Sequence, residues 1–199
     1  MTPTTPAPTE KTAPSCRDEA LRQQLREMAA DERAAEQAAA LAILEAGNQR
    51  AVLRRLRLQH ARELEDIVGH RGWPTVPMVG DESSTYCLQL VLNCENLAFQ
   101  IRCRDLVEKA VADRRCPAAQ YAFIADKVAV AWSRPQRFGT QINPVTTRPY
   151  PIESSQDVDE RRKSVGLAPL VEVLESYRAR LRGEEMPETS TGRRASAEG

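Results

Sequence analysis

The sequence lacks a net charge and lacks any long apolar run. Lys plus Arg and Asp plus Glu number 28 each, so the composition does not favour binding to nucleic acid or to a membrane surface. No run approaches the roughly 20 apolar residues that cross a bilayer. The opening MTPTTPAPTEKTAPS has neither the basic start nor the apolar middle of a signal peptide. We therefore expect a cytoplasmic protein without a membrane or nucleic-acid partner.

Several catalytic and cofactor motifs are also missing. The chain has no G-x-G-x-x-G or G-x-x-x-x-G-K phosphate loop and no G-x-S-x-G elbow. Its two histidines could each pair with an acid on one helix, His60 with Glu63 and His70 with Asp66. His60 lies on an apolar stripe, which favours a core histidine, and Asp66 with His70 is typical of a surface ion pair. We predict no metal and no cofactor.

The chain has few cysteines, and their spacing shows no pairing motif. The five cysteines are odd in number and form no C-x-x-C motif, and Cys87, Cys94 and Cys103 fall inside apolar helical patterns. This favours buried free thiols over a disulfide scaffold.

What the sequence does contain is helical periodicity. The pattern predicts an all-α fold: a single-domain helical bundle of about six or seven helices over residues 17–183, with a long ordered loop and disordered tails at 1–16 and 184–199. We expect Asp81 to cap a helix, Pro117 to take a first helical position, and Trp132 to end an inward stripe. The expected helices cover about residues 20–47, 49–69, 81–94, 98–114, 117–132, 157–166 and 169–183.

Polar groups inside this pattern have two interpretations each. The basic cluster Arg50, Arg54, Arg55 and Arg57 has no interleaved aromatics, so a solvated helix face is favoured over a nucleic-acid site. Gln89 and Asn93 lie one turn apart in the most apolar helix, where buried amides must be hydrogen-bonded. They either bond to a neighbouring loop or line a pocket wall.

The loop SRPQRFGTQINPVTTRPYPIE, residues 133–153, holds four prolines and one glycine and is rich in amides and arginines. We expect Gln136 and Gln141 to bond backbone groups and Gly139 to form a turn, so that the loop is pinned across the bundle. Asp126 lies off the apolar stripe of its helix, pointing to solvent or to this loop.

GWPTVPMVG (72–80), AFQIRC (98–103), IADKV (124–128), PQRFGTQ (135–141) and PIESSQDVDERRKSVGLAPL (151–170) resemble a bacterial domain family of unknown function. Its members read GWP…VG, a Gln-His pair, AYL-x-DRV, PQ-x-YGTQ and PI-x-D…VDERR. This chain departs from them with Leu92-Asn93 in place of Gln-His and with Asp126-Lys127 in place of Asp-Arg. The family has no established reaction, so the resemblance implies a site map. The residues that match its motifs are Trp73, Pro74, Gly80, Asp126, Gln136, Gly139, Thr140, Gln141, Asp159, Arg161 and Arg162.

Three functions follow as hypotheses. The favoured one is an accessory module that binds a small polar ligand or a partner segment in a loop-covered cleft. The second is a cofactor-independent enzyme with Asp126 as acid or base and with Arg161 or Lys127 stabilising an anion. The third is a protein-interaction partner that uses the alanine-rich first helix. The expected ligand-binding residues are Trp73, Asn93, Asp126, Gln136, Thr140, Gln141 and Arg161.

Overall fold

The fold is helical, as predicted. A computed structural model describes residues 17–42 and 46–183, and these contain eight α-helices, one 3-10 helix and one two-stranded ribbon. The chain divides after Asn96 into two compact units, which are described one at a time below. The predicted disordered tails lie outside the described residues. Among the helices that are described, none is both long and apolar enough to span a membrane.

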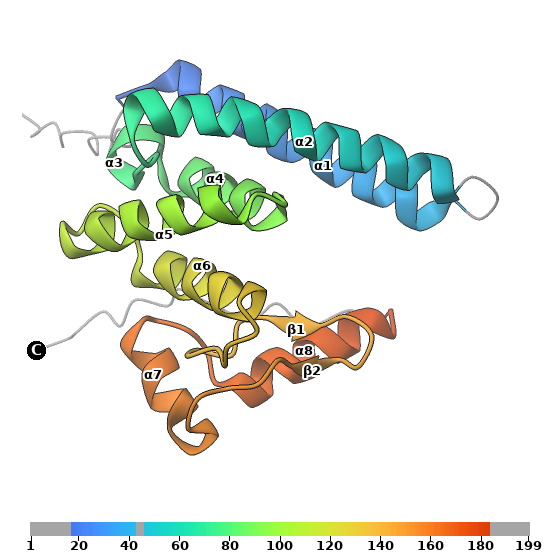
Figure 1. The fold of residues 1–199 in the computed structure, drawn as a ribbon, viewed down its shortest axis with the longest axis vertical. Coiled ribbons are helices and arrows are strands. Elements are labelled where there is room, and N and C mark those ends of the chain that lie inside the picture. Colours follow the sequence, from blue (N-terminus) through green and yellow to red (C-terminus); the bar gives the residue numbers. More distant parts are fainter. Residues whose placement is uncertain (1–16, 43–45, 184–199) are drawn as a thin grey trace, which may run out of the picture. The chain divides into compact units, whose positions relative to one another are not determined.

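The first unit is built on two long helices that lie side by side in opposite directions (Figure 1). Its elements are α1 (Glu19–Leu41), α2 (Ala46–Arg71), α3 (Val76–Val79) and α4 (Asp81–Asn93). The carboxylate of Asp18 caps α1 by accepting from the Leu21 N–H at 3.0 Å, and Arg71 at the end of α2 pairs with the same carboxylate. α4 packs against both long helices, and the buried apolar side chains include Leu21, Leu25, Leu64, Val68, Cys87 and Val91.

The segment GWPTVPMVG differs from the expected break in the helical pattern. It contains the four-residue helix α3, which follows Thr75 and has a proline in its first turn. The predicted cap at Asp81 is wrong, because Asp81 is the first residue of α4 and Gly80 takes the cap position. Gly80 has a φ of +81°, a conformation that glycine adopts without strain.

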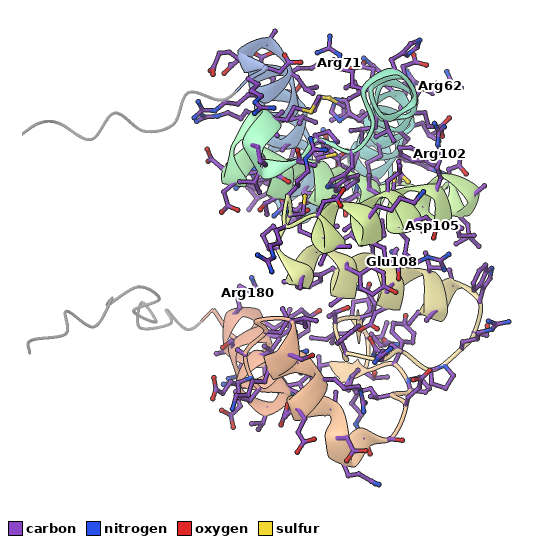
Figure 2. The ribbon with its side chains drawn as sticks, turned by 90° about the vertical axis from the view of Figure 1, so that its left-hand side faces the viewer. Arg62, Arg71, Arg102, Asp105, Glu108 and Arg180 are labelled. Carbon is purple, nitrogen blue, oxygen red and sulfur yellow. The ribbon has the colours of Figure 1, made fainter. Side chains whose placement is uncertain are left out.

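The second unit begins with a helical hairpin. α5 (Leu97–Ala112) packs against α6 (Ala118–Ala131). Arg102, Asp105 and Glu108 are exposed, and their spacing of three residues places them along one side of α5 (Figure 2). The remaining elements are β1 (Ile142–Asn143), β2 (Arg148–Pro149), the 3-10 helix η1 (Ser155–Asp157), α7 (Val158–Ser164) and α8 (Leu170–Leu181).

The two ends of α6 also differ from expectation. Pro117 is the residue before the helix rather than its first helical residue. Trp132, expected inward, is 43% exposed, with the guanidinium groups of Arg104 and Arg134 at 6.0 and 5.2 Å from its ring. Because both cations contact the indole, it is stabilised at the surface rather than in the core.

The cysteine prediction is confirmed for the described part of the chain. Cys87, Cys94, Cys103 and Cys116 are all buried, and none of them forms a disulfide bond.

Candidate functional site

Asp126 is the centre of the loop network in the second unit. Its side chain is completely buried on α6 and accepts the backbone N–H groups of Arg137 at 2.8 Å, Phe138 at 3.1 Å and Thr140 at 2.9 Å. The Thr140 hydroxyl donates to the same carboxylate at 3.0 Å. Of the two predicted directions for the Asp126 side chain, solvent or the loop, the structure shows the loop. A carboxylate surrounded by backbone donors in this way is a positioning group.

The glutamine pins are confirmed. Gln136 is fully buried, and its Nε2 donates to the carbonyl oxygens of Gln141 at 3.0 Å and Tyr150 at 2.9 Å. Its Oε1 accepts from the Gln141 N–H at 2.8 Å. Gln141 in turn donates to the Thr140 hydroxyl oxygen at 3.1 Å and to the carbonyl oxygen of Phe123 at 3.4 Å. The amides thus replace the regular backbone pairing that prolines deny to this loop.

Two arginines of α7 hold the outer side of the same loop. The guanidinium of Arg161 donates to the carbonyl oxygens of Arg137, Glu153 and Ser154. Arg162 is buried and donates to the carbonyl oxygen of Phe138 at 2.7 Å and to that of Ala168 at 2.6 Å. Burial lowers the pKa of Arg162 from its usual range, and the charges of Asp159 and Asp126 act in the opposite direction. All five predicted ligand-binding residues of this unit therefore take part in hydrogen bonds of the loop, a role that was expected only of Gln136 and Gln141.

The other two predicted site residues, Trp73 and Asn93, belong to the first unit. Trp73 is buried just after α2, and Asn93 is the last residue of α4. The hypothesis that all seven residues line one loop-covered cleft stays a prediction. Within the first unit, however, Asn93 belongs to a polar cluster that the sequence did not suggest.

That cluster joins three helices through one carboxylate. Glu32 of α1 is 3% exposed. Its Oε1 lies 3.2 Å from Nδ1 of His60 on α2, and its Oε2 accepts from Nδ2 of Asn93 on α4 at 2.9 Å. Since an ionised carboxylate only accepts, Nδ1 of His60 carries the proton whenever Glu32 is charged. His60 is thus a hydrogen-bonded core histidine, as predicted, and its partner is Glu32 rather than Glu63.

Arg57 extends the cluster to the edge of the unit. Its terminal nitrogen pairs with Glu36 of α1, and its Nε lies 3.5 Å from Oε2 of Glu32. This Nε is buried and has no hydrogen-bond partner among the described residues. The carboxylate of Glu32 therefore compensates the charge of this group without accepting a hydrogen bond of normal geometry from it.

Two cavities flank the cluster, and Asn93 lines both. The first has a volume of about 350 Å³, and the second of about 220 Å³. The lining of the first is Ala29, Glu32, Arg33, Glu36, Gln89, Leu90, Leu92 and Asn93. The lining of the second is Arg50, Leu53, Arg54, Arg57, Leu58, Asn93 and Glu95. The polar residues of the first cavity are therefore two acids, two amides and one arginine, and those of the second are three arginines, one amide and one acid.

A family model for a family of unknown function, DUF6624, matches residues 8–181. The chain belongs to this family. No curated protein and no solved structure matches the chain significantly. Membership in DUF6624 fixes no reaction, so the candidate site of this family member depends on its own geometry.

Of the two interpretations of the α4 amides, the pocket wall is favoured, because Gln89 and Asn93 both line the first cavity. Gln89 is exposed rather than buried, and Asn93 bonds to a carboxylate on α1 rather than to a loop. The expected ion pair of Asp66 and His70 is also different, because the histidine Nδ1 donates to the Asp66 carbonyl oxygen at 2.8 Å.

Glu32 is the functional candidate that the sequence interpretation missed. It continues the apolar stripe of Leu21, Leu25 and Met28 at i+11, i+7 and i+4, so it had to point inward. A carboxylate on one apolar stripe and a histidine on the next is the signal that could have paired Glu32 with His60.

Proposed function

We propose that this chain binds a small polar ligand in the cavity of the first unit that is lined by Glu32 and Asn93. The observation that carries the proposal is a buried carboxylate, tied to a histidine and an amide, at the wall of a cavity of about 350 Å³. Small-molecule sites range over about 300–1,000 Å³ and place a few fixed polar groups on largely apolar walls.

The wall of this cavity offers both hydrogen-bond donors and hydrogen-bond acceptors. Nδ2 of Asn93 is engaged with Glu32, which fixes the amide plane and leaves its Oδ1 as an acceptor. Gln89 adds an exposed amide one turn earlier, and Arg33 adds a cation. Ala29 and Leu90 provide the apolar part of the surface. A compact ligand that carries its own donors and acceptors fits this set.

Binding is favoured over catalysis by the position of the titratable groups. His60 is 4% exposed and is not among the residues that line either cavity, so it orients Glu32 instead of touching a ligand. Asp126, the acid or base of the rival hypothesis, is enclosed by donors of its own loop. Neither group is placed as a proton-transfer residue must be.

The experiment is a thermal-shift screen of polar metabolites against wild type, Gln89→Ala and Asn93→Leu. A ligand at about one hundred times its Kd stabilises the folded protein by about 2.7 kcal/mol, which is several degrees in Tm. We expect this shift in wild type and a clear reduction in both variants. Gln89 makes no hydrogen bond within the described residues, so its variant should fold even if Asn93→Leu does not.

Gln24→Ala is the matched control, since Gln24 is an exposed glutamine of α1 outside the cavity. It should keep the full ligand-induced shift. A compound whose shift persists in both cavity variants and disappears in Asp126→Ala would place the site in the second unit and refute this proposal.

A further inference from the structure

We propose that the second cavity is an anion site, which binds a carboxylate or phosphate group carried by the ligand. The inference rests on the proposed function and deepens it, because it assigns a chemical class to the ligand. The two cavities share Asn93 as a lining residue, so they adjoin each other at this side chain.

Positive charges outnumber negative charges among the residues that line the second cavity. Arg50, Arg54 and Arg57 follow one another at i, i+4 and i+7, which places three guanidinium groups on one face of α2. Like charges at this spacing destabilise a helix by a few tenths of a kcal/mol per pair. Glu95 is the single acid among the lining residues. The lining residues thus carry two more positive than negative charges, although Arg57 is also paired with Glu36 and Glu32, which do not line this cavity.

Two of the three guanidinium groups are available for an anion. Arg50 makes no hydrogen bond or ion pair within the described part of the chain. Arg54 pairs with Glu95 at 3.4 Å, but both side chains are well exposed, at 70% and 65%. Exposed pairs of this kind hold their partners weakly, so a ligand carboxylate or phosphate can replace Glu95.

Arg57 supplies the fixed end of the site. Its ion pairs with Glu36 and Glu32 hold the side chain in one place at the cavity wall. An arginine that is already oriented loses little freedom when it binds an oxygen of an anion.

The rest of the wall limits the ligand's size and shape. Leu53 and Leu58 are apolar lining residues, and the volume is about 220 Å³. No aromatic side chain on which a base could stack is among the lining residues, which argues against a single-stranded nucleic acid as the occupant. A short organic acid or a small phosphorylated compound fits.

The test is an NMR titration of the full chain with two probes, inorganic phosphate and butyrate, followed through the Asn93 side-chain amide. The variants are Arg50→Gln with Arg54→Gln, and, as a control of equal charge, Arg55→Gln with Arg62→Gln. Arg55 and Arg62 are exposed on the same helix and line neither cavity, and Arg62 is labelled in Figure 2. Because charge-assisted hydrogen bonds are lost, we expect Kd to rise about tenfold or more in the cavity variant. The control should stay close to wild type.

Saturation by phosphate alone or by butyrate alone, with this variant pattern, supports the site and identifies the group it prefers. If both double variants bind the probes equally weakly, the net charge of the protein explains the binding, and the anion site is overturned. Absence of saturation by either probe in the millimolar range would also overturn it. In that case, a neutral compound from the thermal-shift screen that still depends on Gln89 would leave the proposed function standing.

Discussion

At the scale of single residues, two buried acids have opposite tasks. Asp126 accepts three backbone N–H groups and a hydroxyl from the loop that follows its helix, and so fixes backbone. Glu32 accepts from side chains of two other helices and lies at a cavity wall. The first satisfies donors that have no other partner, whereas the second presents polar groups to a space that a ligand can enter.

Replacement of Asp126 by Asn tests the first task. The amide keeps one acceptor oxygen but turns an NH₂ group toward N–H donors, so buried donors lose their partner. We expect the free energy of unfolding to fall by about 3 kcal/mol, measured by urea denaturation. Asp113→Asn, at an exposed position of the same unit, should change it by less than about 0.5 kcal/mol. A loss at Asp126 no larger than at Asp113 would show that the network does not hold the loop.

The residues that were predictable from sequence are those whose chemistry is local. The pins at Gln136 and Gln141 follow from amides in a proline-rich loop that lacks regular pairing. Glu32 was not predicted because its partners lie 28 and 61 residues away in the chain. Trp132 was misplaced because periodicity cannot anticipate two flanking arginines. Helix identity depends on neighbours in sequence, and polar clusters depend on neighbours in space.

At the scale of elements, the loop after α6 behaves as a folded element in its own right. The N–H of Gln136 donates to the carbonyl oxygen of Pro151 at 2.8 Å, and the N–H of Glu153 donates to the Gln136 carbonyl oxygen at 2.9 Å. Between these ends, the short ribbon pairs Ile142 with Pro149 in antiparallel register. Pro and Gly therefore shape the loop without leaving it loose.

Gly139 is a position in this element where a side chain would be poorly tolerated. Its φ is +68°, and a Cβ there would lie 3.0 Å from Cδ1 of Ile152 and 3.3 Å from Cδ1 of Leu170. Gly166 has a similar φ of +77° with open space around it. Gly166→Ala should cost about 1 kcal/mol from backbone strain alone.

Gly139→Ala should cost at least about 1 kcal/mol more, because side chains must also move. Chemical denaturation of the two variants measures the difference. Equal losses of unfolding free energy in the two variants would mean that the side chains of Ile152 and Leu170 move aside at no cost, and that the loop is loosely packed at this point.

At the scale of the whole molecule, the chain consists of two compact units that meet in sequence at Asn96. Periodicity predicted the helices on both sides of this point but gave no sign of a division, because no Gly- or Pro-rich linker separates α4 from α5. The first unit carries the cavities, and the second carries the loop network. Both units contain buried apolar residues, such as Leu25 and Leu64 in the first and Cys103 and Val107 in the second.

Hydrogen exchange of the Asp126→Asn variant tests this separation. We expect faster amide exchange across α5 to α8, since loss of the loop anchor raises the population of locally opened states there. Peptides from α1, α2 and α4 should exchange as in wild type. Equal acceleration in both units would mean that the chain unfolds as one cooperative block.

The tip of the β1–β2 hairpin is a suitable place to insert a reporter. Asn143 closes it by accepting the N–H groups of Val145 and Thr146, while Val145 is 88% exposed. All anchors of the loop lie on either side of this tip, at Gln141 and before it, and at Tyr150 and beyond. A fluorescent reporter or an affinity peptide could therefore be inserted between Val145 and Thr146 without disturbing the hydrogen bonds of the Asp126 carboxylate.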